Sequence, residues 1–442
     1  MYLSYIIILS VGFIILFFIN KNSLIKSFQK SLLKNKLFFW LTMIIVLMLF
    51  VPYGGTNRYE GGDDLGVAKI VRLFGFAVLT LITFLYFSIK KMIKVKRSLY
   101  HFYFYIFFCF ISAFYSPGPV ETLWKSIELL GLLLLIIVLR NEIYSGNLSS
   151  SNILEGIIYL LLVFVILSLV GILLFPKLAM TPVIDGMEFS NESLWGIIPK
   201  LNPNSFAQFS AMLSFVGMFY SIYTKKSKTG AIVIIMVGLL GQFFAYSRTS
   251  MLAFVLVCIF LFILKKDYKL IFFGFIPIFI ILFLQDNILE YVSRGQDLDQ
   301  LSSLSGRTYM WQLAWESIQN NYLFGIGYYS GHKTLNVEIG MEFTSLDNTY
   351  IESLVDIGIL GTFFLFLLVI KTFIRNLKFW KLIKKQLNFN WVILSLGFLV
   401  IMFVRSLTGP TFQNFNINLY FLLLLYISTE KRPHISSFLN NN

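Results

Sequence analysis

The chain has little charge and almost no cysteine. Only 13% of its 442 residues are charged, whereas 57% are hydrophobic, a composition far from that of an average soluble domain. Its two cysteines, Cys109 and Cys258, both lie within long apolar runs, so neither a disulfide nor a metal cluster is indicated. Repeats with a period of 20–50 residues are also missing, which gives no support for a solenoid. The composition therefore indicates an integral membrane protein.

Long apolar segments make up most of the chain. A segment of 17 or more residues with few charges can cross a hydrocarbon core of ~30 Å, so we expect about 13 transmembrane segments, within a range of 12 to 14. Backbone groups in lipid must form hydrogen bonds within their own segment, which makes these segments helices. We therefore predict an all-α, polytopic membrane protein that forms one domain over residues 1–442. The expected spans are 2–19, 37–53, 70–89, 99–115, 123–139, 153–175, 205–224, 230–246, 249–264, 270–285, 349–370, 391–404 and 415–428.

Basic residues fall mainly on one side of these spans. When the loops are assigned alternately to the two faces, one face holds 25 of the 36 Lys and Arg residues. The opposite face, including its interface, holds 18 of the 22 Asp and Glu residues. Cytoplasmic loops carry an excess of Lys and Arg, so we expect the N-terminus outside, the C-terminus in the cytoplasm and the long segment 286–348 outside. This asymmetry accounts for the net charge of +14 without a nucleic-acid partner.

The segment 286–348 concentrates the polar chemistry of the chain and forms the one large extracytoplasmic loop. Within it, residues at about 306–321 are expected to form an amphipathic helix on the outer membrane surface, with Tyr309, Trp311 and Trp315 at interfacial depth. The apolar positions recur at helical spacing, at Met310, Leu313, Ala314 and Ile318. A glycine-rich turn, LFGIGYYSG, follows, and its glycines would permit a close approach of the backbone to a ligand.

Two arginines near the outer face are candidates for binding phosphate. Arg248 lies where two apolar segments meet, in YSRTSML, and Arg307 lies at the expected start of the surface helix, in SGRTYMW. A guanidinium presents a rigid fork of donors that matches phosphate oxygens. Each arginine could instead extend to lipid headgroups or form a simple ion pair. Arg405 also lies near an outer helix end, where the headgroup interpretation is favoured.

Acidic residues gather at the start of the helix that follows the loop. Asp347 and Asn348 immediately precede TYIESLVDIGILG. Asp347 is interpreted either as a helix N-cap or as a general base that deprotonates a sugar hydroxyl. Glu352 and Asp356 are one turn apart on a shared helical face, and acids in a membrane helix usually face the protein interior or a wet cavity. His332, in the preceding turn, is either a catalytic residue or a bystander.

Four motifs in this order, SRTSMLAF, SGRTYMW, LFGIGYYSG and LDNTYIESLVDIGILG, resemble the C-terminal signature of the bacterial O-antigen polymerase/O-antigen ligase (Wzy/WaaL-type) superfamily. The segment NPNSFA, which contains Asn204, resembles a turn common in that superfamily. The resemblance covers roughly residues 200–365 and implies a GT-C-like helical fold. It also implies a donor glycan on undecaprenyl pyrophosphate and an inverting transfer that needs neither metal nor cofactor.

The resemblance assigns roles by motif position. Arg248 and Arg307 match arginines associated with the donor pyrophosphate, and Asn348 matches the asparagine of the helix-start motif. Ligases typically carry His-Asn at the helix start, whereas this chain has Asp347-Asn348, and His332 lies fifteen residues earlier. We therefore expect a polymerase with Asp347 as the candidate base. Secondary site candidates are Arg405, Glu352, Asp356 and Asn204.

The expected function is a glycosyltransferase of the bacterial cytoplasmic (inner) membrane that polymerises O-antigen, capsule or exopolysaccharide. The closest alternative is a ligase that transfers the finished glycan to a surface acceptor. A flippase or transporter would need charges along a central cavity and usually internal symmetry, whereas the charges here gather at the outer face. The expected partners are the lipid-linked oligosaccharide, membrane lipid, a chain-length regulator and a flippase, and no nucleic acid.

Overall fold

The protein is helical throughout the part that the structure describes. The computed structural model describes a few positions between residues 7 and 88, and then residues 99–181, 193–197, 200–223, 228–265, 307–338, 345–383 and 390–430. Over these ranges, strand-like pairing is confined to an isolated bridge between Met180 and Leu194. The elements are α5 (Tyr100–Ile111), the 3₁₀ helix η2 (Ser112–Phe114), α6 (Pro119–Tyr144), α7 (Ser150–Leu174), α8 (Pro176–Ala179), α9 (Pro203–Tyr223), α10 (Lys228–Phe244), α11 (Arg248–Lys265), α15 (Arg307–Asn320), α16 (Gly331–Glu338), α17 (Thr349–Ile383), α18 (Asn390–Ser406) and α19 (Ile417–Ser428).

The described helices coincide with the expected spans. Five of them, α6, α7, α9, α11 and α17, are long and apolar enough to cross a membrane, and α5, α10, α18 and α19 are shorter apolar helices. An all-helical, multi-pass membrane architecture is thereby confirmed. The expected spans 2–19, 37–53, 70–89 and 270–285 lie wholly or largely outside the described residues. The total of about 13 spans and the GT-C-like arrangement stay predictions.

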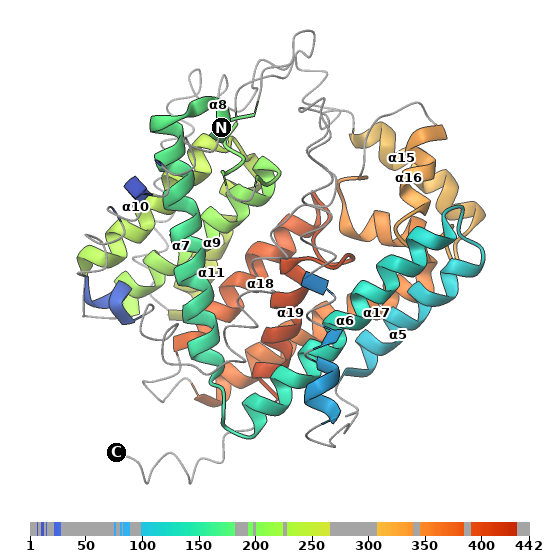
Figure 1. Ribbon diagram of the computed structural model, residues 1–442, viewed down its shortest axis with the longest axis horizontal. Helices are drawn as coiled ribbons and strands as arrows, with labels where there is room; N and C mark the ends of the chain where they lie inside the picture. Colours follow the sequence, from blue (N-terminus) through green and yellow to red (C-terminus); the bar gives the residue numbers. More distant parts are fainter. Residues whose placement is uncertain are drawn as a thin grey trace.

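The helices fall into two groups joined by a central pair (Figure 1). In one group, α9 packs against α10, α11 and α7. In the other, α17 packs against α5 and α15, and α5 packs against α6. The central pair is α18 and α19: α18 contacts α11 and α17, and α19 contacts α17 and α6. The two short helices α15 and α16 lie together at one end of the second group (Figure 1).

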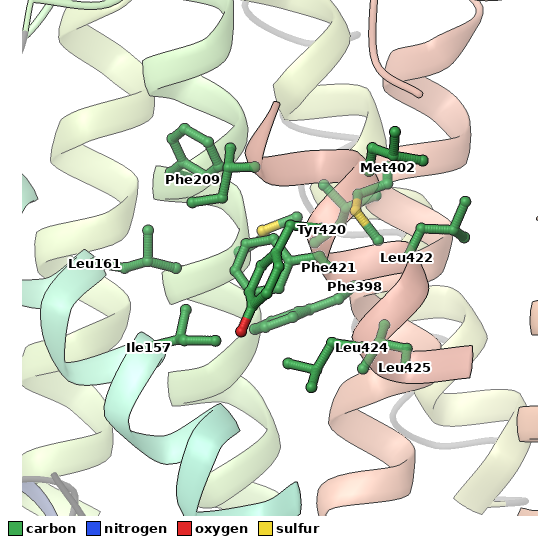
Figure 2. Packing of buried hydrophobic residues seen from close by; sticks show 14 of the residues in the cluster. Ile157, Leu161, Phe209, Phe398, Met402, Tyr420, Phe421, Leu422, Leu424 and Leu425 are labelled. Carbon is green, nitrogen blue, oxygen red and sulfur yellow. The ribbon is translucent and has the colours of Figure 1, made fainter. Parts of the chain in front are cut away.

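The centre of the protein is formed around α19. Every residue of this helix is buried, as expected for a helix that is apolar on all sides. Close packing, rather than the exclusion of water, holds helices together in lipid, so such contacts maintain the central pair between the two groups. Figure 2 shows Tyr420, Phe421, Leu424 and Leu425 of α19 packed among Phe398 and Met402 of α18, Phe209 of α9, and Ile157 and Leu161 of α7.

Loops expected on the same side of the membrane lie together in the structure. Arg140, at the end of α6, forms an ion pair with Glu430, and both belong to the expected cytoplasmic face. At the opposite end, the Tyr115 hydroxyl donates a hydrogen bond to the Phe324 carbonyl at 2.6 Å, and both belong to the expected outer face. The alternation of loops therefore agrees with the fold, whereas the absolute orientation stays a prediction.

Helix α17 is interrupted at Gly358. Its φ of 62° and ψ of −170° are not helical, and L side chains disfavour this region. A Cβ atom at Gly358 would also collide with the backbone of Leu323 and Phe324. Backbone groups at the break are satisfied by the incoming loop: the N–H of Ile359 donates to the Tyr322 carbonyl at 2.8 Å. The break therefore fastens the loop after α15 to the side of α17.

The part of α17 beyond the break is long enough to cross a membrane by itself. At 1.5 Å per residue, residues 359–383 extend about 37 Å, which exceeds a hydrocarbon core of ~30 Å. Residues 349–357 are consequently not needed for spanning. Glu352 and Asp356 lie in this preceding part, next to the loop.

The glycine-rich turn packs against the protein itself. A Cβ atom at Gly325 would lie 2.5 Å from the Asp356 carbonyl carbon, and one at Gly327 would lie 2.6 Å from Ser116. The N–H of Gly327 donates to the Asp356 carbonyl at 2.8 Å. These glycines therefore allow contact with α17 and with the segment after α5. The sequence suggested that these glycines permit a close approach to a ligand. In the structure they instead permit close packing against the protein itself.

We expect Gly358→Ala to lower the stability and abundance of the protein strongly. A backbone with positive φ and ψ near 180° is essentially restricted to glycine and costs roughly 1–3 kcal/mol for alanine, and forcing a methyl group into a filled space costs about 1–3 kcal/mol more. Thermal unfolding of the purified protein in detergent measures the effect. Gly146→Ala is the matched control, because Gly146 also has a positive φ of 82° but its Cβ would meet nothing within 4 Å. Equal melting temperatures for the two variants would contradict a packed break.

Candidate functional site

An ion pair joins the start of α15 to the segment before α17. The Arg307 Nε donates a hydrogen bond to Asp347 Oδ2 at 3.0 Å, and Nη2 lies 2.9 Å from the same oxygen. The side chains are 22% and 35% exposed, so the pair is accessible from outside the protein. The residue expected to bind pyrophosphate and the residue expected to act as a base are therefore in direct contact.

Two more arginines lie within electrostatic range of this ion pair. Arg248 begins α11, and Arg405 lies in the last turn of α18. Arg248 is close enough to Arg307 for their charges to repel, and Arg405 interacts electrostatically with both Asp347 and Arg307. Arg405 is 6% exposed and its Nη1 donates to the carbonyl and hydroxyl of Thr408. The Arg307–Asp347 pair thus has two further guanidinium groups within electrostatic range of Arg307, and a guanidinium presents a fork of donors that matches phosphate oxygens.

The N-cap of α17 is Asn348. Its Oδ1 accepts the N–H groups of Tyr350 and Ile351, at 2.9 and 3.1 Å, which is the geometry of a helix cap. Its Nδ2 donates to the Leu407 carbonyl at 3.0 Å, so the cap also ties α17 to the segment after α18. The interpretation of Asp347 as the cap is therefore wrong. Asp347 adopts a positive φ of 52° and pairs with Arg307 instead.

His332 is buried between two carboxylates of α17. Its Nδ1 lies 2.9 Å from both carboxylate oxygens of Asp356, and its Nε2 lies 3.7 Å from Glu352 Oε1. Each of the three residues is 1% exposed. Burial alone would lower the pKa of His332, but the charges of Asp356 and Glu352 outweigh burial and raise its pKa to about 9. His332 is therefore an imidazolium at neutral pH, and an imidazolium has no free nitrogen with which to accept a proton.

Glu352 connects this buried cluster to Asp347. Its Oε2 accepts the Ser345 hydroxyl at 2.8 Å and the Leu346 N–H at 3.1 Å. The Ser345 hydroxyl oxygen in turn accepts the N–H of Asp347 at 3.1 Å. The cluster of His332 and its two carboxylates consequently positions the short segment that carries Asp347.

Part of the chain matches a known protein family. Residues 230–367 match the Wzy_C family, described as O-antigen ligase. The resemblance to the O-antigen polymerase/ligase superfamily is thereby confirmed. The matched segment contains Arg248, Arg307, His332 and Asp347, but it does not separate polymerases from ligases. No curated protein matches the chain.

Other functional candidates lie outside the segment that matches the family model. Asn204 precedes the segment, and its carbonyl accepts the Ser250 hydroxyl at 3.4 Å, which places the start of α9 beside the start of α11, where Arg248 lies. Gln413 follows the segment, and its Nε2 donates to Glu352 Oε1 at 2.7 Å. Gln413 could not be recognised from the sequence, because a single amide between two apolar helices is common.

A buried ion pair on α6 was also missed. Lys125 Nζ lies 3.0 Å from Glu128 Oε2, with the side chains 3% and 1% exposed. Lys125 and Lys333 both lie against the ring of Tyr329, at 4.7 and 4.1 Å from its centroid, and Lys333 pairs with Glu121 at 2.6 Å. Charged residues inside the expected span 123–139 were the available signal, since such residues are rare in membrane helices and usually functional.

The surface helix of the loop is present as α15, and its apolar face packs on protein. Met310, Ala314 and Ile318 are buried in a cluster with Leu335 of α16 and Val355 of α17. Its opposite face exposes two of the aromatic residues expected at interfacial depth, and Trp311 donates its indole N–H to the Leu346 carbonyl at 2.8 Å. α15 is therefore held by α16 and α17, which fixes Arg307 relative to Asp347.

The elevated pKa of His332 predicts a pH-dependent stability. Because the folded-state pKa of about 9 lies above the unfolded value of about 6.5, this stabilisation is fully present below pH ~6.5 and is lost as the pH rises through ~9. We expect the melting temperature of the wild type to fall across this range, and His332→Gln to remove much of that fall while lowering stability at neutral pH. His101→Gln, in α5, is the control that should keep the wild-type profile. Superimposable profiles for wild type and His332→Gln would contradict a charged His332.

Proposed function

We propose that this protein is a polysaccharide polymerase that joins repeat units carried on undecaprenyl pyrophosphate at the outer face of the bacterial cytoplasmic membrane. The observation that carries the proposal is the contact of Arg307 with Asp347 at one end of the helices, with Arg248 and Arg405 within electrostatic range of Arg307. The family match supports a lipid-linked oligosaccharide as the substrate. A chain-length regulator and a flippase are the proteins expected to work with it.

In the proposed reaction, a terminal sugar hydroxyl of one lipid-linked unit attacks the anomeric carbon of the growing chain. The new glycosidic C–O bond forms as the bond from that carbon to the pyrophosphate breaks, which gives inversion at the carbon. Undecaprenyl pyrophosphate leaves with the bonding electrons, and the arginines stabilise its increasing negative charge. The hydroxyl proton passes to Asp347. These residues supply the proposed chemistry without a metal ion.

Arg307 has two tasks in this scheme. In the structure its Nε donates to Asp347 Oδ2, and its Nη2 lies 2.9 Å from the same oxygen. A guanidinium has five N–H donors, so Arg307 can also donate to a phosphate oxygen without releasing Asp347. It would therefore hold the base beside the leaving group. This geometry suits a base that acts on a hydroxyl approaching the anomeric carbon.

The polymerase is favoured over a ligase by the residues at the start of α17. Ligases typically carry His-Asn there, whereas this chain has Asp347-Asn348, and its loop histidine is buried between carboxylates. The family match is compatible with either enzyme, so the ligase is the second candidate. A flippase is disfavoured because the arginines converge at one end of the helices rather than along their length.

A deletion strain tests the proposed function directly. Its surface glycan, separated on a gel that resolves chain lengths, should show acceptors that carry single repeat units, and the full ladder should return with the wild-type gene. Undecorated acceptors together with accumulated lipid-linked chains would instead indicate a ligase. Repeat units trapped in the cytoplasm would indicate a flippase.

The outer location of the site predicts the reactivity of introduced cysteines. Gln319, on the exposed face of α15, should react as cysteine with an impermeant maleimide added to intact cells or spheroplasts. Lys378→Cys, on the exposed side of α17 at the opposite end, should react only after the membrane is permeabilised. Cys109 and Cys258 are buried and should contribute little background. The reverse labelling pattern would overturn both the orientation and the outer location of the site.

A further inference from the structure

A second site candidate lies at the far end of α15 from Arg307. A cleft of about 690 Å³ opens between the C-terminal end of α15, the loop that follows it and Tyr115. From Arg307 to Asn320, α15 extends about 20 Å at 1.5 Å per residue. That distance is to the far edge of the cleft, whose lining includes none of the three arginines and not Asp347. Its polar and aromatic lining residues are Glu316, Ser317, Asn320, Asn321, Tyr115 and Phe324.

The lining of the cleft suits an uncharged, hydroxyl-rich ligand. One carboxylate, one hydroxyl and two amides provide both donors and acceptors of hydrogen bonds. Its lining residues include neither lysine nor arginine, so the cleft offers no site for a phosphate. The two aromatic rings offer flat apolar surfaces, and their negative faces attract the C–H groups of a sugar ring. An acyl chain would leave the amides and the carboxylate without hydrogen-bond partners.

The aromatic edge of the cleft is already formed. The Tyr115 hydroxyl donates to the Phe324 carbonyl at 2.6 Å, which links the segment after α5 to the loop. That loop is fastened in turn to α17, because the Ile326 N–H donates to the Val355 carbonyl and the Gly327 N–H donates to the Asp356 carbonyl, both at 2.8 Å. Tyr115 and Phe324 are still 42% and 46% exposed. A rigid but accessible edge lowers the entropic cost of binding.

We propose that this cleft is a glycan subsite that binds the sugar portion of a long oligosaccharide whose reacting end lies at the arginine cluster. The proposal rests on the proposed function, since it names where part of the substrate of that reaction binds. A chain of one or two sugars does not extend from Arg307 to Asn320. The subsite would therefore hold long chains only, and its loss would change chain length rather than the formation of a single bond.

Binding of a free oligosaccharide tests the subsite without any transfer reaction. The full-length protein in nanodiscs is titrated with the surface glycan of its own strain, released from lipid by mild acid and separated into short and long fractions. We expect the long fraction to bind, and the double variant Asn320→Ala/Asn321→Ala to weaken its binding by about 10-fold. Gln319→Ala, on the same helix but outside the cleft lining, is the control and should bind like the wild type.

The ladder of the complemented deletion strain provides the second measurement. The double variant should give shorter chains, with a normal melting temperature and normal formation of the first linkage. Wild-type affinity together with a wild-type ladder would overturn the subsite. If the double variant keeps its glycan affinity but retains less lipid, counted by native mass spectrometry, the cleft is a surface that faces the membrane. This result would overturn the subsite as well.

The failure of this subsite and the failure of the proposed function give different results. Arg307→Lys should bind the free long fraction normally, because that fraction carries no pyrophosphate. If the double variant loses glycan binding but deletion of the gene leaves the ladder intact, the polymerase is refuted and the subsite stands. A lost ladder on deletion combined with a neutral double variant would refute the subsite alone.

Discussion

Replacing Arg307 by lysine should reduce glycan transfer by ~10-fold or more, although the charge is kept. Arg307 contacts Asp347 Oδ2 with two nitrogen atoms and lies within electrostatic range of Arg248 and Arg405. A lysine ammonium is a single point donor that cannot hold Asp347 in this way and also present a fork to a phosphate. Because the leaving pyrophosphate gains charge in the transition state, the rate of transfer should fall more than the affinity for the donor.

The measurement is the rate of chain extension by the purified variant, compared with its amount and melting temperature. Arg248→Lys should lose activity in the same way. Arg375→Lys is the matched control, because Arg375 lies towards the opposite end of α17, with its guanidinium 4.2 Å from the ring of Tyr426. Full activity of Arg307→Lys at a normal protein level would reduce Arg307 to a structural ion pair or a contact with lipid headgroups.

The helices were predictable from the sequence for a simple physical reason. A backbone in lipid must satisfy its own hydrogen bonds, so a long apolar segment has one structure available to it. The short helix α16 carries no such constraint, and no helix was expected there. The break at Gly358 was also unpredicted, because glycine is frequent in membrane helices and its backbone conformation leaves no mark in the sequence. Both features depend on a loop returning to α17.

The candidate residues were predictable, but most of their contacts were not. The placement of Glu352 and Asp356 on one helical face followed from their spacing of four residues. That this face meets His332 depends on the contact of the loop with the break in α17, where Gly325 and Gly358 let two backbones touch. The pairing of Arg307 with Asp347 likewise depends on α15 packing on α17, a contact between segments 40 residues apart. Local patterns cannot report such long-range contacts.

Asp347→Asn should lower the rate of chain extension by ~10²–10⁴-fold, the usual effect of removing a general base. Asparagine keeps an oxygen that can accept from Arg307, but it has no basic site for the hydroxyl proton. The ion pair that is lost is more than one-third exposed on the Asp347 side, so its contribution to stability is only ~0–1 kcal/mol. The variant should therefore fold, and its loss of activity should far exceed its loss of stability.

The neighbouring residue supplies the control that makes this prediction decisive. Asn348 is the cap of α17, so Asn348→Ala should cost about 1 kcal/mol of stability with a much smaller loss of rate than Asp347→Asn. His332→Ala should mainly destabilise the protein, because it leaves Asp356 and Glu352 buried without their cation. If Asp347→Asn shows a normal glycan ladder while a folded His332→Ala variant has lost polymerisation, the base is not Asp347. We expect polymerisation to be lost in Asp347→Asn instead, because the buried imidazolium of His332 has no nitrogen free to accept a proton.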